Sequence, residues 1–215
     1  MRAKEVLADA IPKADLIIVD EAHRVSPNGI SYKWIIDDFT EHGKAAAYRI
    51  PALAVSTQGT VLAFAEARRL DGRDIGDIDA VLRRSEDNGK TWGPEIVIWD
   101  DKERSVNNPS AVLDPKTGRI FVFMGRWDGS TPSQHVAYSD DDGKTWSKSK
   151  DMSKILRDQI KDGRTLVIPG PGSGIVLQRG KHVGRLIRHP GVLVMPPLQI
   201  PPAAEREAGH EHDKE

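Results

Sequence analysis

The chain has 215 residues, of which 38% are hydrophobic and 29% charged, proportions typical of a globular protein that can bury a core. Its 31 Lys and Arg residues balance 32 Asp and Glu residues, and the net charge of -1 gives no overall field that would draw it to nucleic acid or to an anionic membrane. The absence of cysteine excludes disulfides, thiolate catalysis and cysteine-based zinc sites. We therefore expect no nucleic-acid or membrane partner, no metal ion and no cofactor.

The first 39 residues predict a short α/β segment. An apolar run at 16–19 predicts a strand, and the residues Ser, Pro, Asn and Gly at 26–29 predict the turn after it. A helix capped by Ser31 should follow. Its apolar face would consist of residues at the spacing of one helical face, Tyr32, Ile35, Ile36 and Phe39. Charged residues interrupt the apolar stretch that a secretory signal needs, so we expect no signal peptide in this chain.

Residues 48–187 have a different sequence pattern. Short apolar runs alternate with Gly, Asp and Asn turns at close, regular spacing, which is typical of an all-β fold. The expected strands cover residues 50–55, 60–66, 78–84, 96–99, 120–124 and 135–139. Residues 40–47 form the junction with the preceding segment. Residues 188–215 are rich in proline and then polar, and they predict a disordered tail in which His210 and His212 are solvated.

An eight-residue motif occurs twice in this region. The sequence from Ser85 to Trp92, SEDNGKTW, returns as SDDDGKTW from Ser139 to Trp146, 54 positions later. Ser and Asp oxygens can accept hydrogen bonds from the backbone of a tight turn, Gly can take a positive φ, and Trp can pack between neighbouring sheets. A repeat of this length with about four strands per unit predicts a β-propeller.

Calcium binding is the alternative interpretation of the second copy, where Asp140, Asp141 and Asp142 precede a glycine. A calcium loop also needs a bidentate acid at a set later position, and neither copy has one. The motif therefore favours a structural turn.

The repeat resembles the Asp-box of sialidases. Upstream, Arg49-Ile50-Pro51 is similar to the Arg-Ile-Pro motif of that family, and the run FAEARR at 64–69, followed by DIGDID at 74–79, also fits its pattern. A later run, PGPGSG at 169–174, resembles the Gly-Pro-Gly loop of the family, and the match ends near residue 187. The chain thus resembles the N-terminal half of bacterial exo-sialidases over about residues 48–187. This implies a partial β-propeller and a glycoside hydrolase that releases terminal sialic acid from glycans with retention.

The resemblance also assigns roles to individual residues. Arg49 would bind the carboxylate of sialic acid, because a planar guanidinium offers paired donors to a planar carboxylate, and Arg68 would line the substrate pocket and bind the sugar. Asp74 would be the general acid/base that protonates the leaving oxygen and then activates water. The competing carboxylates are Asp71, Asp77 and Asp79, and the last two lead directly into a strand, so we favour Asp74.

The expected nucleophile is missing from the matched region. Sialidases use tyrosine, which avoids repulsion from the substrate carboxylate. The tyrosines here are Tyr32, Tyr48 and Tyr138, and none lies in a context like that of the nucleophile. Family members carry that tyrosine, its glutamate and two further arginines in later blades. We therefore expect a truncated or rearranged sialidase that is weak or inactive alone, or else a non-catalytic module that binds sialosides. Family members are often secreted or periplasmic, but the localisation of this chain stays open.

A second resemblance concerns residues 1–39. The run ADLIIVDEAHR at 14–24 is similar to motif II of superfamily 2 DEAD/DEAH helicases, in which an Asp-Glu pair, here Asp20 and Glu21, coordinates the magnesium of ATP. No phosphate-binding loop precedes it. We interpret it as a helicase-like fragment joined to the second region, and an ATP-dependent helicase fragment is the third functional alternative.

Overall fold

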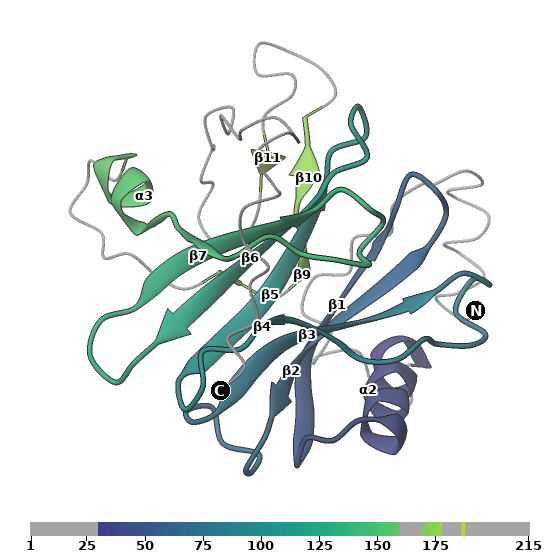
Figure 1. Ribbon diagram of the computed structural model, residues 1–215, viewed down its shortest axis with the longest axis horizontal. Coiled ribbons are helices and arrows are strands. Elements are labelled where there is room, and N and C mark those ends of the chain that lie inside the picture. Colours follow the sequence, from purple (N-terminus) through teal and green to yellow (C-terminus); the bar gives the residue numbers. More distant parts are fainter. Residues whose placement is uncertain (1–29, 160–168, 171, 178–185, 188–215) are drawn as a thin grey trace, which may run out of the picture.

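The computed structural model describes residues 30–159, 169, 170, 172–177, 186 and 187 (Figure 1). Helix α2, Ile30–His42, confirms the predicted helix. Because it begins at Ile30, Ser31 lies inside the first turn and not at the predicted cap. The helicase-like motif with Asp20 and Glu21, the strand and turn expected before the helix, and the tail with His210 and His212 lie outside the described residues. The prediction that residues 1–39 form a separate unit stays a prediction.

Two four-stranded antiparallel units follow the helix. The first blade consists of β1 (Ala47–Val55), β2 (Val61–Arg68), β3 (Ile78–Ser85) and β4 (Ile96–Trp99). The second blade consists of β5 (Ser105–Leu113), β6 (Ile120–Trp127), β7 (Ser133–Ser139) and β8 (Lys150–Asp151). In each blade the strands pair in chain order, and a single parallel residue pair, Ile78 with Ser105, links the two.

Shorter elements complete the described chain. Helix α3 (Ser153–Gln159) follows the second blade. Strand β9 (Gly172–Ser173) pairs in parallel with β5, and β10 (Ile175–Val176) pairs with β11 (Leu186–Ile187). Figure 1 shows α2 beside β1 and β2 at one side of the molecule and α3 beyond β7 at the other. None of the helices within the described ranges is long and apolar enough to span a membrane.

The six strands expected from the sequence are confirmed, but β5 was not predicted. Its sequence, SVNNPSAVL, contains two asparagines and a proline, which argue against a strand. The pairing of β5 with β6 slips between Asn107 and Ser110, so Pro109 sits in a bulge where the ladder needs no N–H, and Asn108 has a φ of 52°.

Strand β1 contains a similar bulge. Its register with β2 slips between Arg49 and Ala52, Pro51 lies in the bulge, and Ile50 has a φ of 54°. A β-branched residue with positive φ is strained, and such strain persists only where the surrounding structure imposes it. The two blades therefore begin with matching bulges, each centred on a proline.

The main core lies between the two blades. Alternate residues of the central strands point into it, because successive side chains of a strand face opposite sides. The first blade contributes Leu62, Phe64, Ala80 and Leu82, and the second contributes Val106, Ile120, Val122, Met124 and Ala137. All are buried. This face-to-face packing of four-stranded units is the arrangement of neighbouring blades in a propeller.

Helix α2 covers the opposite face of the first blade. Ile35 and Phe39 pack on a surface made of small residues in β2, Ala63, Ala65 and Ala67, which lets the helix lie close to the sheet. The buried Arg83 of β3 donates hydrogen bonds to the carbonyl and the carboxylate of Asp38 in the helix. Helix and blade thus share one secondary core.

Both Asp-boxes are tight structural turns. In the first, the Asp87 carboxylate accepts hydrogen bonds from the Thr91 amide at 2.9 Å and the Thr91 hydroxyl at 2.6 Å, and Ser85 accepts one from the Gly89 amide at 2.8 Å. The second repeats these contacts with the residues 54 positions later. Gly89 and Gly143 have φ angles of 81° and 79°, as predicted.

The second turn also docks on the first blade. Asp142 is buried and accepts hydrogen bonds from Thr60 at 2.5 Å and from Arg84 at 2.8 Å. The indole of Trp146 packs edge-on against Phe64 in the main core, as expected for a tryptophan between sheets. The matching Trp92 packs against the α2 side of the first blade.

Candidate active site

A pocket of about 310 Å³ lies where the two proline bulges and the β2–β3 loop meet. The bulge residues Ile50 and Asn108 line it, and β2 contributes Glu66 and Arg68. Asp74, Ile75, Asn107 and Trp127 complete the lining. The pocket therefore draws on both blades, and the strained positions in β1 and β5 are the ones that form part of its wall.

Arg68 is the buried cation of this pocket. Its side chain is 2% exposed, and its Nε and Nη2 atoms donate to Glu66 Oε2 at 3.2 and 2.8 Å. The remaining Nη1 donates to the carbonyl of Gly72 at 2.7 Å. Burial of a guanidinium is costly unless it is paired, and Glu66, itself 1% exposed, provides the pair.

Asp74 connects the two arginines that the sequence singled out. Its Oδ1 atom lies 2.7 Å from Arg68 Nη1 and 3.4 Å from Arg49 Nη1. Asp74 is 79% exposed and Arg49 52% exposed, so both stand at the open side. The structure thus brings Arg49, Arg68 and Asp74 together, although Arg49 is not among the residues that line the pocket.

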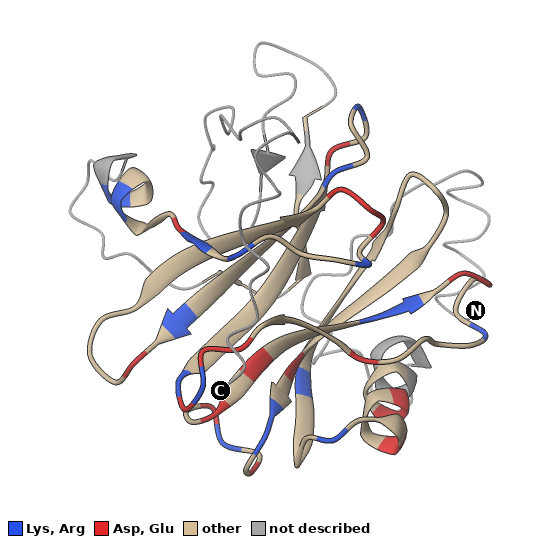
Figure 2. Ribbon diagram, in the orientation of Figure 1, with Lys and Arg blue, Asp and Glu red and all other residues tan. Residues whose placement is uncertain are grey.

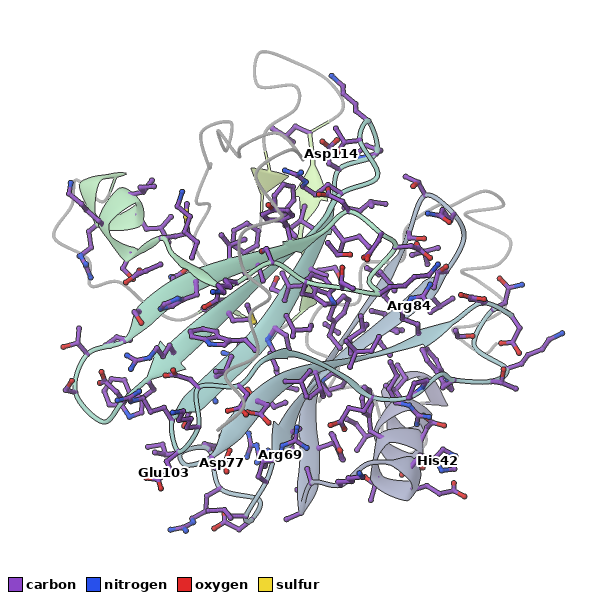
Figure 3. All side chains as sticks on the ribbon, in the orientation of Figure 1. His42, Arg69, Asp77, Arg84, Glu103 and Asp114 are labelled. Carbon is purple, nitrogen blue, oxygen red and sulfur yellow. The ribbon has the colours of Figure 1, made fainter. Side chains whose placement is uncertain are left out.

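The competing carboxylates have other partners. Asp79 is buried and accepts a hydrogen bond from Arg69 Nε at 2.6 Å. Burial raises the pKa of the Asp79 carboxyl, although the Arg69 guanidinium opposes this. Hydrogen bonds from Arg73 lower the pKa of Asp71, at the surface of the loop. The carbonyl of Asp77 accepts the Arg69 amide at 2.9 Å, and Figure 3 shows these two residues together at one end of the sheet.

Neither Tyr48 nor Tyr138 lines this pocket. Tyr48 points to the other face of β1, where its ring stacks on Phe39 with centroids 5.1 Å apart and its hydroxyl donates to Glu95. Burial raises the pKa of Tyr48 above its usual value, and the Glu95 carboxylate adds to the effect. The Arg119 guanidinium lies over the Tyr138 ring, with its Cζ atom 4.3 Å from the ring centroid. The side chain of Tyr32 is outside the described residues.

Sequence reasoning assigned no site role to six residues that line the pocket: Ile50, Glu66, Ile75, Asn107, Asn108 and Trp127. Glu66 could have been suspected, because it is the one acid in a strand that is apolar from Val61 to Ala65 and is buried on both faces. Asn107, Asn108 and Trp127 belong to β5 and β6, and no local sequence pattern reveals that these strands approach β2. Among the described residues, no group of three or more His, Asp or Glu is arranged to hold a metal ion.

The chain has two neighbouring blades, each with an Asp-box turn. These features define a β-propeller repeat protein. The chain belongs to the family of BNR repeat-like domains, whose model matches residues 59–190.

Its curated relatives are sialidases. The chain is 33% identical over 168 residues to the exo-alpha-sialidase of Aspergillus fumigatus, a match that covers 64% of this chain and 40% of the relative. It is 34% identical over 156 residues to the sialidase of Paraclostridium sordellii, covering 63% of this chain and 38% of the relative. The chain therefore spans about two fifths of the length of these curated relatives.

A solved sialidase structure has a similar fold. The Hadza microbial sialidase Hz136 superposes with a TM-score of 0.58 at 29% identity, over 69% of this chain and 32% of that one. The predicted all-β, partial β-propeller fold with Asp-box repeats is confirmed, and so is the similarity to exo-sialidases. Nothing in these comparisons bears on the helicase-like motif.

Proposed function

We propose that this chain carries the first part of an exo-sialidase active site, with Arg49 and Arg68 as ligands of the substrate carboxylate and Asp74 as the general acid/base. The observation that carries the proposal is that the Asp74 carboxylate lies within 3.4 Å of both guanidinium groups, beside a pocket lined by Arg68 and Asp74. The sialidase relatives support it.

The pairing of Asp74 with both arginines is informative about the ligand. A carboxylate already lies between the two guanidinium groups, so the pair can accept a carboxylate there. When the carboxylate of a sialoside takes these donors, the exposed Asp74 side chain is released toward the leaving group. Its position on a loop, 79% exposed, permits that movement.

In the proposed reaction, a protonated Asp74 donates its proton to the glycosidic oxygen as the bond from that oxygen to the anomeric carbon breaks. A nucleophile forms a bond to the anomeric carbon. The Asp74 carboxylate then removes a proton from a water molecule, whose oxygen bonds to that carbon as the bond to the nucleophile breaks, so the sugar leaves with retained configuration. No tyrosine among the described residues lines the pocket, so the nucleophile must come from elsewhere. We therefore expect hydrolysis by this chain alone to be weak or absent.

The absence of a tyrosine from the described lining favours a second candidate, a module that binds sialosides without cleaving them. The two proposals share Arg49 and Arg68 and differ in turnover. In both, the partner is a sialic-acid-containing glycan.

Hydrolysis of a fluorogenic sialoside by the purified chain tests the first proposal. Asp74→Asn should lower any turnover by about 10²-fold or more, since it removes the acid/base, and Arg49→Ala should weaken substrate binding. Asp71→Asn is the matched control, because it removes an exposed carboxylate from the same loop outside the pocket lining. Turnover that survives Asp74→Asn would contradict the assignment.

Binding without turnover, lost in Arg49→Ala, would select the second candidate. A folded chain that neither binds nor cleaves a sialoside would contradict both.

A further inference from the structure

Glu66 holds two different parts of the pocket with its two carboxylate oxygens. Oε2 accepts both hydrogen bonds from Arg68, at 3.2 and 2.8 Å. Oε1 accepts the backbone amide of Asn108 at 2.8 Å and lies 3.4 Å from Nδ2 of Asn107. An acid of the first blade therefore joins the buried arginine to the proline bulge of the second blade.

The two hydrogen bonds to Glu66 hold the Arg68 side chain in one orientation. With Nε and Nη2 occupied on the Glu66 side, Nη1 faces the β2–β3 loop, where it meets Gly72 and Asp74 at 2.7 Å. A free arginine side chain has several rotatable bonds, and fixing it before a ligand arrives lowers the cost of binding.

Glu66 also stabilises the bulge of β5. Asn108 sits at a φ of 52° in a stretch where the register of β5 with β6 slips, so its amide is outside the regular ladder. Glu66 accepts a hydrogen bond from that partly buried amide, and the Asn108 side chain in turn donates to the carbonyl of Pro169 at 2.7 Å. An unpaired amide here would cost free energy and loosen the pocket wall.

We infer that Glu66 is a positioning residue, which orients Arg68 toward a ligand carboxylate and fixes the Asn107–Asn108 bulge beside it. The ligand in this inference rests on the proposed function, whereas the orientation of Arg68 does not. In this inference Glu66 acts on the ligand through Arg68 and through the bulge.

If Glu66 acted only through its charge, its neutralisation would change the affinity for an anion in the opposite direction. Glu66 places a negative charge next to an anion site, so its neutralisation without any loss of positioning would strengthen the binding of an anion. Positioning predicts weaker binding on neutralisation. The direction of the change therefore decides between the two.

Glu66→Gln is the variant that tests this. All four groups that face the carboxylate are N–H donors, so one end of the amide must point an NH₂ group at either Arg68 or Asn108. We expect the affinity for N-acetylneuraminic acid, measured by titration calorimetry, to fall about tenfold or more. Glu86→Gln is the matched control, because Glu86 is 70% exposed and pairs with Arg84 outside the pocket; its affinity should not change.

The Nε–H signal of Arg68 in a ¹⁵N-edited spectrum gives a readout that needs no ligand. In the wild-type chain it should exchange slowly with water, and in Glu66→Gln it should exchange rapidly while the backbone spectrum keeps its dispersion. If the wild-type chain fails to bind the sugar, the proposed function fails and this signal still tests the positioning role.

Equal or tighter binding in Glu66→Gln, or an unchanged Arg68 signal, would overturn the inference. If Glu66→Gln does not fold, Glu66→Asp takes its place, since it keeps the charge but is one methylene too short to reach both partners. Binding and an Arg68 signal both unchanged in Glu66→Asp would equally overturn it.

Discussion

Arg49 and Arg68 approach the same carboxylate from very different surroundings. Arg49 is 52% exposed and has a long contact with Asp74, whereas Arg68 is 2% exposed and paired with the buried Glu66. In the proposed site, Arg49 would therefore act mainly on the ligand, whereas Arg68 would bind the ligand and also stabilise the fold through Glu66.

Substitution by methionine should separate the two roles. Arg68→Met leaves Glu66 buried without its partner, and we expect it to lower the free energy of unfolding by about 3 kcal/mol. Arg49→Met should change it by less than about 0.5 kcal/mol, because an exposed ion pair contributes little. Urea denaturation of both variants checks this, and equal losses of stability would contradict it.

At the scale of elements, the two Asp-boxes are held by carboxylates that accept several hydrogen bonds. In the first, contacts from Thr91 and Ser85 hold the pKa of Asp87 well below its usual range. Folding therefore favours the charged carboxylate, and the contribution of Asp87 to stability depends on pH.

Because the folded pKa of Asp87 is depressed, its stabilisation is fully present above the unfolded pKa of about 3.9 and is lost as the pH falls toward the folded value. Asp87→Asn should thus destabilise the chain equally at pH 6 and pH 7, and the difference from wild type should shrink below about pH 4. Denaturation across this pH range measures it, with Glu86→Gln as the control. A difference independent of pH would refute the role of the charge.

Helix α2 is the second element whose contribution can be measured. Phe39 is 1% exposed and packs on Tyr48 and the alanines of β2, so Phe39→Ala should cost about 3–4 kcal/mol of unfolding free energy. Glu41→Ala, on the exposed side of the same helix, controls for helix propensity. A cost below about 1 kcal/mol would mean that the helix does not share the core of the first blade.

For the whole molecule, the sequence revealed the repeat unit better than the contacts between units. The Asp-box turns and six strands follow from local chemistry, because Gly, Asp and Ser act on their own backbone. Strand β5 was missed because Pro109 argues against a strand unless a bulge accommodates it. The contact of Glu66 with Asn108 joins residues 42 positions apart, and no local pattern predicts such a pair.

Two blades packed face to face form an open sheet array with charged residues mainly at strand ends and in loops (Figure 2). The pocket lies at one such end, where the bulges of β1 and β5 meet. The two described blades therefore supply the proposed carboxylate site, and no tyrosine among the described residues lines it.

The central claim is that this pocket binds the carboxylate of a sialoside. A titration of the ¹⁵N-labelled chain with a methyl sialoside, followed by chemical shifts, tests it most directly. We predict shifts confined to the pocket, at residues 49–50, 66–77, 107–108 and 127. Shifts centred elsewhere, such as the cleft between Trp99 and Trp146, or none at millimolar ligand, would contradict it.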